Sequence, residues 1–60
     1  MTVQEMLNGL FQLGLSQAEV AEKCDSTQPT ISRAANGAQV RYELGKAIEE
    51  LYRASTSQAA

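Results

Sequence analysis

The sequence predicts an all-α fold, a small bundle of about four helices. Apolar residues recur at helical spacing in four separate stretches of the 60-residue chain. Two of these stretches begin with the same helix-start pattern, a hydroxyl residue followed three positions later by Glu. Only Phe11, Tyr42 and Tyr52 are aromatic, so any core must be built from aliphatic and Ala side chains. These features favour packed helices over a β-sandwich.

The first helix is expected over residues 3–13. The Thr2–Glu5 segment is a capping box, in which the Thr hydroxyl can accept from the backbone three residues on and Glu can reach back. The apolar residues that follow lie on one face of a helix: Val3, Met6, Leu7, Leu10 and Phe11. Gly14 then supplies a left-handed stop.

A second helix is expected over residues 17–24. The Ser16–Glu19 segment repeats the capping box, and a short apolar stripe follows it at Val20, Ala21 and Cys24. Residues 25–27 interrupt the periodicity, because Asp, Ser and Thr tend to bond to their own backbone. The interruption predicts a turn of about three residues.

A third helix is expected over residues 28–35, with Thr27 as its N-cap. Pro29 falls in the first turn, where its missing N–H is no loss. The pair Asn36-Gly37 ends the helix with residue types that tolerate a left-handed conformation. Its buried face is expected to hold Ile31 with Ala34 or Ala35.

A fourth helix is expected over residues 41–54. The apolar positions in and just before it again keep helical spacing: Val40, Leu44, Ala47, Ile48, Leu51 and Tyr52. Residues 55–60 are small and polar, and we expect them to form a disordered tail. The whole pattern predicts a single domain over residues 1–54.

The composition excludes several classes of function. Cys24 is the only cysteine and there is no histidine, which excludes an internal disulfide, a zinc site and a Cys–His nucleophile pair. Nothing indicates an enzyme, and we expect no cofactor and no small-molecule ligand. No apolar run approaches the roughly 20 residues of a membrane span, and the first residues do not resemble a signal peptide. We therefore expect a cytoplasmic protein without a membrane partner.

The net charge of −2 argues mildly against a nucleic-acid partner, because nonspecific affinity comes from Lys and Arg residues that neutralise phosphates. The location of the charges matters more than their sum. Residues 15–41 are neutral rather than acidic, since three cations balance three anions there: Lys23, Arg33 and Arg41 against Glu19, Glu22 and Asp25.

The two short helices in the middle of the chain are joined by only about three residues, which is typical of a helix-turn-helix. Residues 15–37 resemble the helix-turn-helix of phage repressors and Cro proteins, whose fold is lambda repressor-like. The residues that match the family's pattern are Gln17, Ala21, Ile31 and Asn36-Gly37. One departure is Asp25, where the family usually has Gly in the left-handed turn position; Asp can adopt this conformation at some steric cost.

Packing arguments agree with this resemblance. We expect the third helix to cross closely over Ala21, whose small side chain allows this, and Ile31 to pack beneath the crossing. A larger residue at position 21 would force the two helices apart. We expect Cys24 to be a small core residue that faces the first helix.

The resemblance implies a sequence-specific, double-stranded-DNA-binding transcriptional regulator whose third helix, about Gln28–Ala35, enters the major groove. The implied base-reading residues are Gln28, Pro29, Ser32 and Arg33. Thr27 and Thr30 are implied to lie close to the DNA backbone. Phosphate contacts are expected from Gln17, Asn36 and Arg41. Such a protein is expected to work near the nucleoid of a bacterial host cell.

We expect a homodimer on a palindromic operator, because one monomer has few cations and little groove contact. The candidate interface residues are Val40, Tyr42 and Tyr52. Gly45, inside the fourth helix, is explained either by chance or by the close approach of another backbone, for instance that of a dimer mate. The alternative function is a protein-interaction module on the same fold that inhibits a polymerase or a repressor.

Overall fold

Residues 1–56, the part of the chain that the computed structural model describes, contain four helices joined by short loops. They are α1 (Val3–Gln12), α2 (Gln17–Lys23), α3 (Gln28–Ala35) and α4 (Tyr42–Thr56). No strand occurs in these 56 residues. The predicted all-α fold is confirmed, with all four helices at the predicted places.

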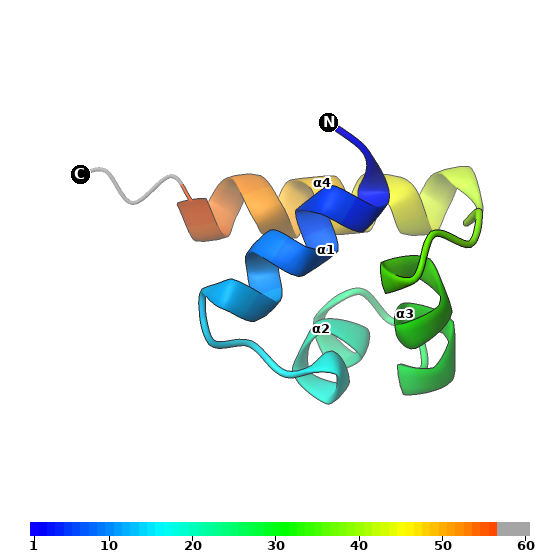
Figure 1. Ribbon diagram of the computed structural model, residues 1–60, viewed down its shortest axis with the longest axis horizontal. Coiled ribbons are helices and arrows are strands. Elements are labelled where there is room, and N and C mark those ends of the chain that lie inside the picture. The colour runs from blue at the N-terminus through cyan, green and yellow to red at the C-terminus, as the bar shows by residue number, and fades with distance from the viewer. Residues whose placement is uncertain (57–60) are drawn as a thin grey trace.

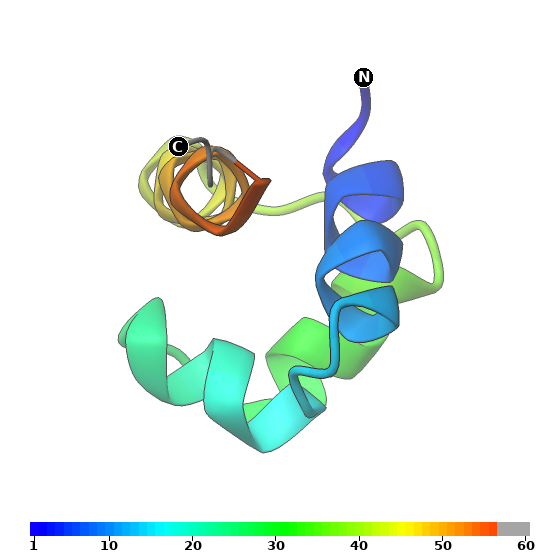
Figure 2. The ribbon, with the colours of Figure 1, turned by 90° about the vertical axis from the view of Figure 1, so that its left-hand side faces the viewer.

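The helices form two groups that meet at α1. In Figure 1, α4 lies along one edge of the molecule, α1 crosses it, and α2 and α3 lie together on the other side of α1. α1 packs against both α3 and α4, whereas α2 packs mainly against α3. The end-on view of Figure 2 shows α4 standing apart from α2. α1 therefore joins α4 to the other two helices.

The beginnings of α1 and α2 follow the predicted capping boxes. The Glu5 N–H donates to Thr2 Oγ1 at 3.1 Å, and the Thr2 N–H donates to Glu5 Oε1 at 2.8 Å. The same reciprocal pair joins Ser16 and Glu19, at 2.9 and 3.1 Å. Each box satisfies two backbone N–H donors that a helix start would otherwise leave to water, which sets where the helix begins.

α1, α2 and α3 all end in a left-handed residue, which is Gly14, Asp25 and Gly37 respectively. Asp25 has φ of 57°, as predicted for the position where the repressor family usually has Gly. The Ser26 N–H then donates to the Ala21 carbonyl at 2.8 Å, the long bond of a Schellman motif. An aspartate thus completes the turn at the steric cost of a left-handed L-residue.

α4 is longer than predicted at its C-terminal end. It continues to Thr56, so residues 55 and 56 are helical and do not belong to a tail. The Thr56 hydroxyl donates to the Tyr52 carbonyl at 2.9 Å, and the Arg53 guanidinium pairs with Glu49 at 2.8 Å, one turn earlier. These local contacts support the last turn. The rest of the predicted tail, residues 57–60, lies outside the described residues.

One hydrophobic core draws side chains from all four helices. Its buried members are Met6, Leu7, Leu10, Val20, Ala21, Cys24, Ile31, Ala34 and Ile48. Ile48 is the only buried residue of α4, so that helix contributes mostly half-buried side chains to the core. The predicted burial of Ala21, Cys24 and Ile31 is confirmed.

Two glycines show how closely α4 approaches its neighbours. A Cβ at Gly9 would lie 2.8 Å from Tyr52 Cε1, so the tyrosine ring packs directly on the α1 backbone. A Cβ at Gly45 would meet Val40 Cγ2 at 3.6 Å and Val3 Cγ2 at 3.8 Å, which are ordinary van der Waals distances. Within the chain, close packing requires a glycine at position 9 and not at position 45.

Candidate nucleic-acid interface

α2 and α3 are held together by small and aliphatic side chains under a tight turn. Ala21 is 5% exposed and Ile31 is fully buried, so the two helices cross with no room for a larger side chain at position 21. Because the inner face of α3 is used for this packing, its opposite face is left to solvent.

The solvent face of α3 carries the residues that the sequence singled out. Ile31 and Ala34 point into the core. Gln28, Pro29 and Arg33 are exposed. The other two predicted contact residues of the helix are half-buried: Thr30 and Ser32. A helix with one face held by the core and a polar opposite face has the form that a DNA major groove, about 12 Å wide, admits.

Thr27 and Thr30 are joined at the start of α3. The Thr27 hydroxyl accepts from the Thr30 N–H at 3.4 Å and donates to Thr30 Oγ1 at 2.9 Å. Thr27 is therefore the N-cap, as predicted. The Thr30 hydroxyl accepts in this pair, which leaves its own proton for a further partner.

The remaining residues predicted to contact phosphates have different surroundings. Gln17 is the first residue of α2 and is half-buried. The exposed Asn36 donates from Nδ2 to the Ser32 carbonyl at 2.9 Å, so part of its side chain is used to close α3. Arg41 is exposed and directly precedes α4.

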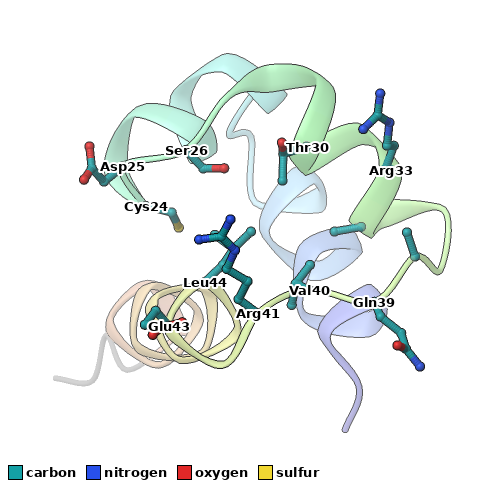
Figure 3. A pocket seen from close by; sticks show the side chains of 12 residues that line it. Cys24, Asp25, Ser26, Thr30, Arg33, Gln39, Val40, Arg41, Glu43 and Leu44 are labelled. Carbon is teal, nitrogen blue, oxygen red and sulfur yellow. The ribbon is translucent and has the colours of Figure 1, made fainter.

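Arg41 extends across a groove that the sequence did not indicate. The groove, about 670 Å³ in volume, lies between the α2–α3 turn, the side of α3 that carries Thr30 and Ala34, and the beginning of α4. Figure 3 shows the Arg41 guanidinium directed toward the turn, below Ser26 and beside Cys24. Arg33 also lines the groove, but its guanidinium points away along the outer side of α3.

A model of the Helix-turn-helix family matches residues 3–58. The chain belongs to this helix-turn-helix family, of the Cro and repressor type. Membership makes it a DNA-binding transcription regulator, in agreement with the exposed face of α3. No curated protein and no solved structure matches the chain.

The helix-turn-helix protein has two arginines near its α3 surface that are free of intramolecular partners. Within residues 1–56, neither Arg33 nor Arg41 makes a side-chain hydrogen bond or an ion pair, whereas Arg53 on α4 pairs with Glu49. An unpaired guanidinium keeps all of its donors for an external anion. The cations near α3 are thus available to phosphate without the breaking of an internal ion pair.

The three residues predicted to form a dimer interface do not share one environment. Tyr42 is 78% exposed at the first turn of α4. Val40 and Tyr52 are half-buried and pack against the core. The sequence analysis took all three for surface residues that the core cannot absorb. Val40 and Tyr52 instead contribute part of their side chains to the packing of the domain.

Other kinds of chemistry find little support in the described residues. No group of three or more potential metal ligands occurs in residues 1–56. Burial raises the pKa of the Cys24 thiol above its usual range, which disfavours the thiolate and any role as a nucleophile. No helix in this part of the chain is long and apolar enough to cross a membrane.

Proposed function

We propose that this helix-turn-helix protein binds specific sites on double-stranded DNA, with α3 in the major groove, and regulates transcription in the cytoplasm of a bacterial cell. The observation that carries the proposal is the row of exposed residues on α3, opposite the buried Ile31 and Ala34. In this geometry the first turns of α3 reach base edges while its inner face stays packed on α2.

Base reading is assigned to the solvent face of α3. Gln28 can pair with adenine in a bidentate manner, and Arg33 can pair with guanine, each pair worth about 1–3 kcal/mol of discrimination. Ser32 can bond to several bases. Pro29 is exposed but carries no polar group, so its contribution is limited to a thymine methyl group or to the orientation of Gln28.

Phosphate contacts are assigned to residues that flank α3. The candidates are Gln17 with the N-terminus of α2, the capping pair Thr27 and Thr30, Asn36 and Arg41. Arg41 has the strongest support, because its guanidinium has no ion pair within residues 1–56. Asn36 offers only the side-chain groups that remain beside its bond to Ser32.

We further propose a symmetric homodimer on a palindromic operator. A monomer with net charge −2 presents only a few cations to the DNA, and two copies double both the cations and the groove contacts. Tyr42, an exposed aromatic residue beside Arg41, is the main candidate for the interface. Val40 and Tyr52, the other two candidates, offer less surface because they are half-buried. The two α3 helices would then lie about 34 Å apart, one turn of DNA.

The experiment is a titration of random and selected duplex DNA over a range of salt concentrations, by fluorescence anisotropy. The wild-type protein should show nonspecific affinity that falls with salt. Arg33→Ala should lose affinity for the selected site and relax its sequence preference, whereas Arg41→Ala should lower affinity on all duplexes and reduce the salt slope by about 0.9 per monomer.

Arg53→Ala is the matched control, because Arg53 is an exposed arginine on α4 that pairs within its own helix. Its DNA binding should equal that of the wild type. Absence of salt-dependent binding to any duplex would contradict the proposal. The alternative module that inhibits a polymerase or a repressor, which the acidic net charge permits, would then be preferred.

A further inference from the structure

The groove beneath the α2–α3 turn combines an apolar floor with polar groups at its rim. Its volume of about 670 Å³ is in the range of small-molecule sites. The apolar lining comes from residues that are buried or half-buried: Cys24, Ala34, Val40 and Leu44. Because these side chains come from three separate segments, the groove exists only in the folded domain.

Hydrogen-bond donors converge on one side of this floor. Figure 3 shows the Arg41 guanidinium below Ser26, with Thr30 farther along α3, and all three residues line the groove. Within residues 1–56, neither the Arg41 guanidinium nor the Ser26 hydroxyl has a side-chain hydrogen-bond partner. The Thr30 hydroxyl, which accepts from Thr27, keeps its own proton. One guanidinium and two hydroxyls that line the same groove therefore have donors without an intramolecular acceptor, as an anionic group requires.

The two carboxylates that line the groove lie away from these donors. Figure 3 shows the Asp25 carboxylate directed outward, beyond Cys24, and Glu43 on α4 below it. Neither carboxylate makes an ion pair with Arg41. The side of the groove below Ser26 is thus positive and the floor is apolar, which suits a molecule with a negative head and a short apolar tail.

We propose that this groove binds a small carboxylate with a short apolar tail. The carboxylate accepts from Arg41, Ser26 and Thr30, while the tail covers Cys24 and Leu44. If the proposed DNA binding holds, on which this second step rests, the ligand competes with DNA phosphates for Arg41. Such a ligand would weaken DNA binding and act as an effector.

The test uses hexanoate as the probe and the full chain without DNA, followed by amide chemical shifts in NMR. Hexanoate should shift the amides of residues 24–26, 30 and 38–44 in a saturable manner. Hexanol, which has the tail without the charge, and inorganic phosphate, which has charge without the tail, should each bind at least about tenfold more weakly.

Variants separate the groove from the DNA surface. Arg41→Ala should weaken hexanoate binding about tenfold or more, and Arg53→Ala should leave it unchanged. Leu44→Ser should also weaken it, through the floor. The proposal is overturned if hexanoate causes only scattered, non-saturating shifts, if phosphate binds equally well, or if Arg41→Ala binds hexanoate like the wild type.

A DNA arm tests the competition. Hexanoate should lower the DNA affinity of the wild type, compared with chloride at the same ionic strength, and should have no such effect on Arg41→Ala. Unchanged wild-type affinity would overturn the effector role. If hexanoate binds the groove but the protein binds no DNA at all, the proposed function fails while the carboxylate site stands.

Discussion

The two halves of α4 are attached to the domain in different ways. In the second half, Tyr52 packs on the backbone at Gly9, so closely that no Cβ fits there without a shift of the ring. In the first half, Leu44 and the preceding Arg41 border an open groove of about 670 Å³. The closed half supplies stability through α1, and the open half leaves polar groups beside α3. The tight packing at Tyr52 and the unpaired donors of Arg41 thus lie at opposite ends of α4.

The largest expected effect is at Ile48, in the middle of α4 where the two halves meet. Ile48→Ala should cost about 2–5 kcal/mol, because Ile48 is fully buried and its loss leaves a cavity. In so small a domain this is expected to unfold most of the protein. Leu44→Ala, beside the groove, should cost less, since Leu44 is half-buried. Urea denaturation of both variants measures the difference. Equal losses would mean that the groove side of α4 is packed as tightly as its middle.

The next effect concerns the crossing of α2 and α3. Ala21→Leu should overpack the contact and cost about 1–3 kcal/mol, because Ala21 is nearly buried between the helices. Ala21→Ser is a control of nearly the same size. The thermal midpoint, followed by circular dichroism, reports the loss. A midpoint for Ala21→Leu equal to that of the wild type would show that these helices do not cross closely.

Substitutions at Gly9 and Gly45 should change the free energy of unfolding less, and they compare the two halves of α4. Gly45→Ala should stabilise the monomer by up to about 1 kcal/mol, because Ala is the better helix former and its Cβ has room. Gly9→Ala should lose this gain, since its Cβ would lie 2.8 Å from the Tyr52 ring. Chemical denaturation of both variants tests this. Sedimentation of Gly45→Ala adds a readout: weakened self-association would place a dimer mate's backbone at position 45.

The smallest effect is a pH dependence at Cys24, on the groove floor. Burial raises the pKa of this thiol above its ordinary 9.0, so the folded protein holds the proton to higher pH than the unfolded chain. The resulting stability is present below the ordinary pKa and is lost as pH rises through the folded value. Alkylation by iodoacetamide should need higher pH in the folded than in the denatured protein. Equal rates would indicate that the groove opens readily.

The helices and their ends could be predicted because their signals are local. Capping boxes at Thr2 and Ser16, and left-handed stops at Gly14 and Gly37, involve residues within one helical turn. The left-handed Asp25 was expected from the resemblance to the repressor family. The end of α4 was placed two residues early, at 54. The bond from the Thr56 hydroxyl to the Tyr52 carbonyl extends a stretch that composition alone marks as a tail.

The candidate site was predicted only in part. The exposure of Gln28, Pro29 and Arg33 follows from the period of α3, because Ile31 and Ala34 fix the opposite face. For Asn36, the sequence could not show that its amide is turned back to the Ser32 carbonyl. The environment of Tyr52 was misjudged, because a helical period does not say which neighbouring helix covers a half-buried ring.

The sequence by itself determined where the four helices lie and which face of α3 turns outward, since each depends on residues within a few positions of one another. Only the tertiary structure decided that Tyr52 covers Gly9 and that Arg41 extends toward the α2–α3 turn. It also decided that a groove opens between this turn, α3 and the beginning of α4. The sequence analysis expected no small-molecule ligand, and only the groove gives a reason to propose one. Such features depend on the angles at which helices cross. Those angles are set by the fit of side chains far apart in the chain, for which no short segment carries a signal.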